Sequence, residues 1–417
     1  LKERKGPKCT DEAKAFYSFL GEKAFQEKGF YLNDICLIAY GLDNRNSEPS
    51  LESLMIGYKE TLSAQRSEDI MKCYSILRSE VMKPDNARFK DHILEVEIPL
   101  NKILASMEYF GINVDITLLQ KNERELRNKA AQVKKTIDKM AGRTMSMGND
   151  EVKRLVFNEL KLTPKVLTPK REPSVSDEAL EVISDQHPII PKILEYKRIN
   201  ALITSGIEPI KKHVDRKTRK VHASYNQDLT NTGRLSCSQP NLQAIPSTSS
   251  DARYIREAVG VESGKILIKA DYSQAEIFVL AALSGCSRLQ NTLMSGSDIH
   301  RATAAEVFGK SIKDVSDAER RAAKAINFGI IYGMTEYGLA KKIGSSPKEA
   351  KGYIDKYFEK YPVIEGYVEA LQEHAIKDNW VFTGTGRKIF LKKDGENIGD
   401  KELMRRAVNA PMQGTVA

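Results

Sequence analysis

The sequence lacks the features that would place it in a membrane or in an oxidising compartment. It has no run of 18 or more uncharged apolar residues, so we expect no membrane-spanning helix. Its five cysteines are odd in number and contain no C-x-x-C pair: Cys9, Cys36, Cys73, Cys237 and Cys286. We interpret them as reduced thiols of an intracellular protein, which excludes a disulfide framework and a cysteine-based zinc site.

An excess of acidic residues is absent as well. The chain has 65 Lys and Arg against 56 Asp and Glu, which gives a formal charge of +9 and a pI near 9.0. This excess favours a polyanionic partner without proving one. With 417 residues, 41% hydrophobic and 29% charged, the composition is typical of a globular protein of about two to four domains.

Residues 316–339 have the most informative pattern in the chain. Acidic residues at its start favour a helix N-terminus, and Arg320, Lys324, Phe328 and Tyr332 then recur every four residues. On a helix these four side chains share one slowly turning face about 18 Å long, with cations at one end and aromatics at the other. A nucleoside triphosphate has the same polarity, but an ordinary amphipathic helix with an aromatic core stripe would also explain the pattern.

Two glycines interrupt the same stretch. Gly329 and Gly333 would each cost a helix interior about 1 kcal/mol relative to alanine. Their proximity indicates that a flat group approaches the backbone there.

A candidate metal ligand lies further upstream. Residues 266–268 are apolar and predict a short buried strand that ends at Asp271, followed by a helix over 274–283. A carboxylate at such a place holds Mg²⁺ or caps the helix, and the segment alone favours neither. Glu276 stands among apolar residues, so its charge needs a partner or a function.

Other segments carry weaker signals. The carboxylates of residues 1–90, namely Asp34, Asp43 and Asp69, are interpreted as caps and surface charges. A helix over 117–141 has an apolar stripe and a basic face, which is either solvated or laid along a phosphate backbone. Residues 383–391 predict a hairpin that turns at Gly386. A last helix from 401 carries polar side chains at a spacing of four, and Pro411 could kink it.

Four long segments resemble the family A DNA polymerases, the group of bacterial DNA polymerase I. They read TGRLSCSQPNLQAIP, ADYSQAEIF, RRAAKAINFGIIYG and RRAVNAPMQGT, and DIHRATAAEVFG stands between the second and the third. The resemblance covers about residues 90–417 and implies an α+β, multidomain right-hand polymerase preceded by a partial exonuclease-like α/β domain. The implied domains are a vestigial exonuclease-like part (1–90), thumb (91–200), palm (201–284), fingers (285–385) and an incomplete return to the palm (386–417).

The resemblance also implies roles for individual residues. Asp271 and the main-chain carbonyl of Tyr272 would hold two Mg²⁺ ions. The residues that would bind the incoming nucleotide are Arg320, Lys324 and His300 at the triphosphate, Phe328 at the sugar, Tyr332 at the base pair, Glu276 below the sugar 2′ position, and the neighbouring Ser273 and Gln274. Those that would contact DNA are Arg234, Gln243, Gly333, Arg405, Asn409 and Gln413.

The chain departs from the family pattern in three places. It ends at Ala417, before the motif with the second metal-binding Asp, so we expect this carboxylate to lie beyond the end of a fragment. Phe278 stands where the family has an Arg. Gln65 and Ser67 replace a Tyr and an Asp of the exonuclease motif, which predicts a vestigial exonuclease.

Three functions follow from this pattern. The first is a template-directed DNA polymerase, expected to work as an intracellular monomer on DNA primer–template and deoxynucleoside triphosphates. The second is a single-subunit RNA polymerase, against which Glu276 argues as a barrier to the 2′-hydroxyl. The third is a catalytically dead, polymerase-derived DNA-binding protein, suggested by the missing second carboxylate.

Overall fold

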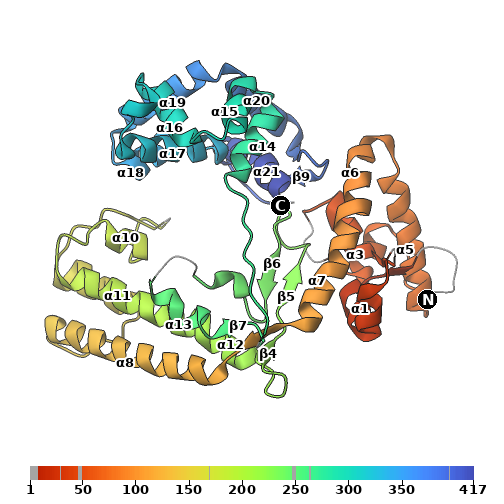
Figure 1. Ribbon diagram of the computed structural model, residues 1–417, viewed down its shortest axis with the longest axis horizontal. Coiled ribbons are helices and arrows are strands. Elements are labelled where there is room, and N and C mark those ends of the chain that lie inside the picture. The colour runs from red at the N-terminus through yellow and green to blue at the C-terminus, as the bar shows by residue number, and fades with distance from the viewer. Residues whose placement is uncertain are drawn as a thin grey trace. The chain divides into compact units, whose positions relative to one another are not determined.

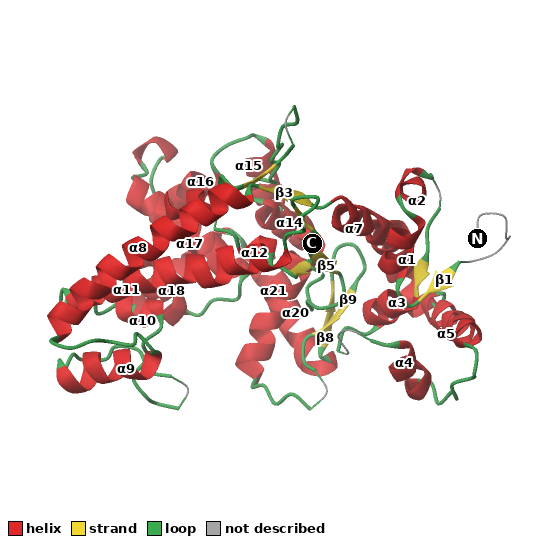
Figure 2. Cartoon of the chain, turned by 90° about the horizontal axis from the view of Figure 1, so that it is seen from below, coloured by secondary structure: helices red, strands yellow, loops and turns green. Residues whose placement is uncertain are grey.

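The chain forms two compact units. The computed structural model describes residues 8–28, 30–45, 49–168, 170–246, 250–262, 264–393 and 395–417. The first unit contains Leu1–Tyr109, Tyr225–Ser236 and Lys269–Ala417, and the second contains Phe110–Ser224 and Cys237–Ile268. Helices prevail over short strands (Figure 2). None of the described helices combines the length and the apolar character needed to cross a membrane.

The N-terminal part of the first unit is a cluster of short helices beside a two-stranded parallel sheet. Its elements are β1 (Cys9–Thr10), α1 (Ala13–Leu20), α2 (Glu22–Gln26), β2 (Asn33–Asp34), α3 (Ile35–Leu42), α4 (Leu51–Gly57), α5 (Arg66–Val81), α6 (Ala87–His92), a π-helical turn (Ile93–Glu97) and α7 (Ile98–Phe110). Residues of α3, α4 and α5 share one buried core with Phe89 and Ile93.

The carboxylates of this part have structural roles. Asp34 is buried and accepts hydrogen bonds from the backbone N–H groups of Cys36 and Leu37, which caps α3. Asp69 accepts from the backbone of Ser63, and Asp43 pairs with Arg45. The sequence prediction of caps and surface charges is confirmed for Asp34, which caps α3, and for the partly exposed Asp43, but it is wrong for Asp69, which is buried and caps no helix.

The C-terminal part of the first unit is a group of packed helices. Its elements are α14 (Ala275–Ser284), α15 (Ser287–Met294), α16 (Ile299–Phe308), α17 (Asp317–Ile331), α18 (Glu336–Ile343), α19 (Pro347–Lys360), α20 (Pro362–Asp378), β8 (Trp380–Phe382), β9 (Lys388–Phe390) and α21 (Asp400–Val416). Helices α16 to α19 lie together in this group (Figure 1). One apolar core joins α14, α17 and α21 through Ile277, Ile326 and Met412.

The predicted hairpin is present at the end of this group. β8 and β9 pair in antiparallel fashion with Trp380 opposite Phe390, and Gly386 has a φ of 93° in the turn. The predicted last helix is α21, which continues through Pro411.

The second unit packs long helices beside a small sheet. Its elements are β3 (Ile112–Val114), α8 (Ile116–Ala141), α9 (Asn149–Lys153), a π-helical segment (Arg154–Glu159), α10 (Asp177–Glu181), α11 (Ile189–Ala201), a second π-helical segment (Leu202–Ile207), α12 (Glu208–His213), β4 (Lys220–Val221), α13 (Arg253–Arg256) and β7 (Val259–Gly260). The antiparallel strand order is β4-β3-β7. Strands β5 (Ser224–Asn226) and β6 (Ser236–Ser238) stand where the chain passes between the units. The predicted basic helix is α8, and it packs along α11 (Figure 1).

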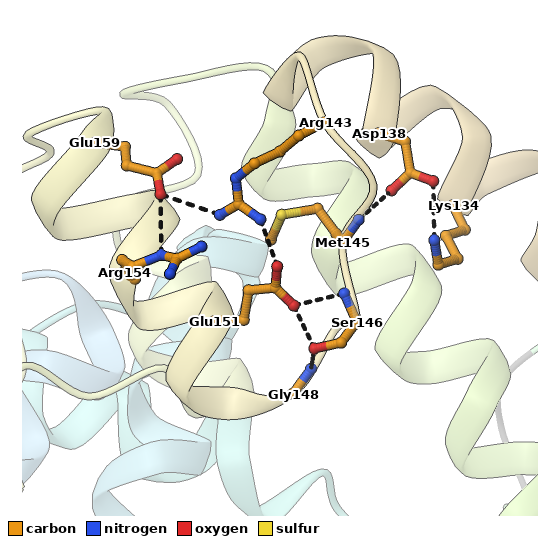
Figure 3. Close-up of polar contacts among 9 residues, drawn as sticks. All are labelled: Lys134, Asp138, Arg143, Met145, Ser146, Gly148, Glu151, Arg154 and Glu159. Atoms are coloured by element: carbon orange, nitrogen blue, oxygen red, sulfur yellow. Dashed lines mark hydrogen bonds and ion pairs between the residues drawn. The ribbon is translucent and has the colours of Figure 1, made fainter.

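A polar network orders the loop that joins α8 to α9 (Figure 3). Arg143 pairs with Glu151 and, at 3.0 Å, with Glu159. Glu151 also accepts from the hydroxyl and the backbone N–H of Ser146, and these bonds and the Arg143 guanidinium lower its pKa to about 2. Each of these exposed pairs adds little stability alone, so the network chiefly sets the conformation of the loop.

The predicted strand over 266–268 is wrong. This segment is not a strand, and Ile266, Leu267 and Ile268 are 81%, 68% and 80% exposed. A strand needs a neighbour for its N–H and C=O groups, and no strand of the described ranges pairs with this segment. The helix predicted after it is confirmed as α14.

Candidate functional site

Helix α17 carries the predicted row of cations and aromatics. Ser316 and Glu319 form a capping box at its start, as the acidic opening predicted. We interpreted the whole of residues 316–339 as one helix, and this is wrong, because α17 ends at Ile331 and α18 begins at Glu336. The break is closed by a hydrogen bond from the N–H of Met334 to the carbonyl of Gly329.

Gly333 accounts for the break in physical terms. Its φ is 58°, which disfavours residues with a side chain. A Cβ at this position would lie 3.1 Å from Cα of Arg405 on α21, so the close neighbour here is protein backbone. Gly329 has only ordinary contacts with Met334 and Leu339. The predicted contact of Gly333 with DNA stays a prediction.

The cations and aromatics share one face, as predicted. The rings of Phe328 and Tyr332 are stacked, with centroids 6.1 Å apart and planes inclined by 15°. The Lys324 ammonium lies 5.9 Å from the centroid of Phe328. The ring centroid of His300, which belongs to α16, lies 5.9 Å from the ring centroid of Phe328. The structure therefore brings His300 to the face of α17, from a different helix.

Asp298 fixes the first cation of the row. One carboxylate oxygen accepts from Arg320 Nε at 2.6 Å, and the other accepts from the backbone N–H groups of His300 and Arg301 at the start of α16. Burial opposes the ionisation of Asp298, but the hydrogen bonds from Arg320 and Arg301 lower its pKa. Our sequence reasoning missed Asp298. Its signal was an Asp directly before a predicted helix, a usual N-cap.

His300 contacts Asn327, a second residue that our sequence reasoning missed. Its Nδ1 lies 3.1 Å from Nδ2 of Asn327, and the same amide group lies 3.0 Å from the hydroxyl of Thr303. All three side chains are almost fully buried. Burial and the nearby cations of α17 lower the pKa of His300, although Asp298 acts in the opposite direction. An Asn within an apolar helix needs polar partners, and this was the available signal.

Glu276 has the partners that its apolar surroundings demanded. It accepts a hydrogen bond of 2.9 Å from Arg234 and one of 2.7 Å from the hydroxyl of Tyr332. Burial, together with the neighbouring Glu276 carboxylate, raises the pKa of Tyr332 to about 12. The Glu276 side chain is only 12% exposed, whereas that of Arg234 is 51% exposed. The Glu276 carboxylate on α14 thus links the loop of Arg234 to Tyr332 at the end of α17.

The candidate metal ligand lies in the exposed segment before α14. Asp271, Tyr272 and Ser273 are exposed, and Gln274 begins the helix with a φ of 59°. Within the described ranges, Asp271 has no hydrogen-bond or ion-pair partner, and no group of three or more His, Cys, Asp or Glu side chains is arranged to hold a metal. The approach of Asp271 to the cations of α17 stays a prediction.

Three of the predicted DNA contacts lie together on α21. Arg405, Asn409 and Gln413 line a hollow of about 390 Å³, whose other walls include Thr232 and Phe390. Glu402 orients Arg405 through hydrogen bonds of 2.8 and 2.6 Å. Gln243 belongs to the second unit, where it stands exposed in a short 3₁₀ turn, Leu242–Ala244.

Comparisons with known proteins identify the family of the chain. The family described as DNA polymerase family A matches residues 116–417. DNA polymerase I of Pseudomonas aeruginosa is 38% identical over 78% of this chain and 36% of its own length. The thermostable DNA polymerase I of Thermus filiformis is 34% identical over 92% of this chain and 46% of its own length. The chain therefore spans less than half the length of these relatives.

A solved structure extends the likeness to the fold. It is the POL domain of Pol1 from M. smegmatis in complex with DNA primer-template and dNTP, which covers 98% of this chain with a TM-score of 0.85 and 28% identity. The chain covers 73% of that structure. The predicted α+β polymerase fold is thereby confirmed. Because the family pattern extends over more than half of the residues, we conclude that the chain belongs to DNA polymerase family A.

Proposed function

We propose that the protein is a template-directed DNA polymerase that adds deoxynucleotides to a primer 3′-hydroxyl. The observation that carries this proposal is the face of α17, where Arg320 and Lys324 precede the stacked rings of Phe328 and Tyr332. A nucleoside triphosphate placed along this face would have its phosphates at the cations and its base at the aromatics. The family and the solved polymerase complex support the same reading.

The reaction is a phosphoryl transfer. The primer 3′-oxygen attacks the α-phosphorus, the bond from this phosphorus to the bridging oxygen breaks, and pyrophosphate leaves. Negative charge accumulates on the departing oxygens, which Arg320 and Lys324 would stabilise. Lys324 is also our candidate for the acid that protonates the leaving group, since it is exposed on the same face.

Divalent metal ions fit one part of the site. Asp271 offers an exposed carboxylate, and the main-chain carbonyl of Tyr272 follows it directly. Magnesium is usually held by one or two carboxylates together with substrate phosphates, so this donor set suits it. Two Mg²⁺ ions, when bound, would favour ionisation of the primer hydroxyl and neutralise charge on the attacked phosphate.

Glu276 is our candidate for the selection of deoxyribose. Its carboxylate is fixed from two sides by Arg234 and Tyr332, so it cannot move aside freely for a 2′-hydroxyl. The row of Arg405, Asn409 and Gln413, with Arg234 and Gln243, would contact template or primer. The minor groove offers acceptors at similar places for every base pair, so such donors can test the shape of a pair without reading sequence.

The experiment is primer extension with matched deoxy- and ribonucleotides. A DNA polymerase extends the primer with the templated deoxynucleotide, whereas an RNA polymerase would use the ribonucleotide. A polymerase-derived DNA-binding protein would bind the duplex, as measured by fluorescence anisotropy, without extension and without tighter binding in the presence of the templated nucleotide. This last result would contradict the proposal. We further propose that the protein acts as an intracellular monomer, because its substrates are there and one chain supplies the whole face of α17.

A further inference from the structure

The ring of His300 has a buried polar neighbour, Asn327. The side-chain amide nitrogen of Asn327 faces Nδ1 of His300 at 3.1 Å. An amide nitrogen donates hydrogen bonds and cannot accept them, so Nδ1 must be the acceptor in this pair. A neutral imidazole with an unprotonated Nδ1 carries its single proton on Nε2.

The second ring nitrogen remains available. Within the described ranges, Nε2 of His300 has no hydrogen-bond partner. This atom is not fully buried and therefore keeps some contact with solvent. The charged groups that face the ring are Asp298 at the start of α16 and Arg320 and Lys324 on α17. The Nε2–H group is therefore an unused donor beside two cations.

We propose that Asn327 is a positioning residue that holds His300 as the neutral Nε2–H tautomer, so that His300 donates an uncharged hydrogen bond to a phosphate of the incoming nucleotide. This inference rests on the proposed function for the identity of the acceptor. The tautomer itself rests only on the contact between the two side chains.

The arrangement has a consequence for nucleotide binding. Burial and the two cations lower the pKa of His300, so above neutral pH the triphosphate meets two fixed positive charges and one neutral donor. The contribution of His300 to nucleotide affinity should then be constant above neutral pH. An imidazolium at the same place would make a stronger, charge-assisted bond that is lost as pH rises.

Nuclear magnetic resonance tests the tautomer without any substrate. The chain is labelled with ¹⁵N only in its six histidine rings, and long-range proton–nitrogen correlations are recorded at pH 7.5, with His300→Gln to assign the signal. We expect a pyridine-type Nδ1 and a pyrrole-type Nε2 for His300. The reverse pattern, or two protonated nitrogens, overturns the proposal. This result is independent of whether the protein extends primers.

Asn327→Asp tests the functional part, and Asn291→Asp on the exposed face of α15 is the matched control for the added charge. A carboxylate at 327 would accept a hydrogen bond from a protonated Nδ1 and so raise the pKa of His300. In Asn327→Asp we expect the KM for the deoxynucleotide to rise about fivefold between pH 6.5 and 8.5. This rise is measured relative to the change that the native chain and the control share. The change in kcat should be smaller. Equal pH profiles for all three proteins contradict the proposal. If Asn327→Asp does not fold, the nuclear magnetic resonance spectrum of the native chain still tests which ring nitrogen of His300 carries the proton.

Discussion

The buried ion pair between Arg387 and Glu97 gives the sharpest test of how the first unit is held together. Arg387 stands in the turn before β9, and Glu97 stands at the end of the π-helical turn before α7. Their side chains are both 6% exposed and form a close ion pair. Gln227 and His92 also bond to the Glu97 carboxylate, at 2.7 and 3.0 Å. Three segments far apart in sequence, around residues 92–97, 227 and 387, thus meet at one charge. We consider the substitution Arg387→Met.

The expected loss of stability is large because the partner charge stays behind. Removal of one member of a buried ion pair leaves an uncompensated charge and costs about 3–5 kcal/mol. Gln227 and His92 still donate to Glu97 and would keep the cost toward the lower end of this range. In the double variant Arg387→Met with Glu97→Gln no isolated charge remains, so we expect it to recover about 1–3 kcal/mol relative to the sum of the single losses.

Urea unfolding followed by tryptophan fluorescence measures these losses. The chain has a single tryptophan, Trp380, which pairs with Phe390 in the hairpin of β8 and β9, and Arg387 stands between these two strands. The signal therefore reports on the first unit and not on the second. A midpoint for Arg387→Met within the error of the native chain would refute the reasoning. So would a double variant whose loss equals the sum of the two single variants.

Four further outcomes follow from the structure. Glu276→Ala should lower discrimination against ribonucleotides in primer extension by at least about tenfold while the unfolding free energy falls by less than about 2 kcal/mol; unchanged discrimination would contradict the role of the carboxylate. Burial and the charge of Arg387 lower the pKa of His92 to about 4, so the folded state binds fewer protons than the unfolded chain between about pH 4 and 6.5. The resulting stability is present above pH 6.5 and lost as the pH falls through 4, and His92→Gln should flatten this slope in urea titrations at several pH values. Ser316→Ala removes the capping box of α17 and should cost about 1 kcal/mol in the same assay, whereas Ser316→Thr should cost less. Gly333→Ala should cost at least about 1–2 kcal/mol, because φ is positive and the backbone of α21 is close; Gly352→Ala on α19, where a Cβ meets open space, is the control expected to stabilise or to have no effect.

Local patterns predicted the helices well. The start of α17, the basic helix α8, the hairpin around Gly386 and the carboxylate caps of the N-terminal part all follow from residues close together in the sequence. The single face of cations and aromatics on α17 needed only the helical repeat. These features depend on contacts within a few residues, which is the range that a sequence pattern encodes directly.

The remaining features depend on partners that the sequence does not announce. Residues 266–268 have a strand composition, but a strand also needs a neighbour, and pairing is decided by distant segments. The break after Ile331 comes from the approach of α21 to Gly333. Asp298 and Asn327 acquire their roles because α16 packs against α17, and their sequence signals indicate a helix cap and a buried polar group without naming the partners.

The links around α17 are unequal in strength, and this has a mechanical consequence. Polar contacts tie α17 to α16 at several points along its length, namely Arg320 to Asp298, Asp317 to Arg301, and Asn327 to His300 and Thr303. Toward α14 the described residues form one polar link, the hydrogen bond from Tyr332 to Glu276, worth about 1 kcal/mol. A swing of α17 away from α14 would thus break this hydrogen bond and the apolar contacts of Ile277 with the shared core, while the polar contacts with α16 would keep His300 and Arg320 together.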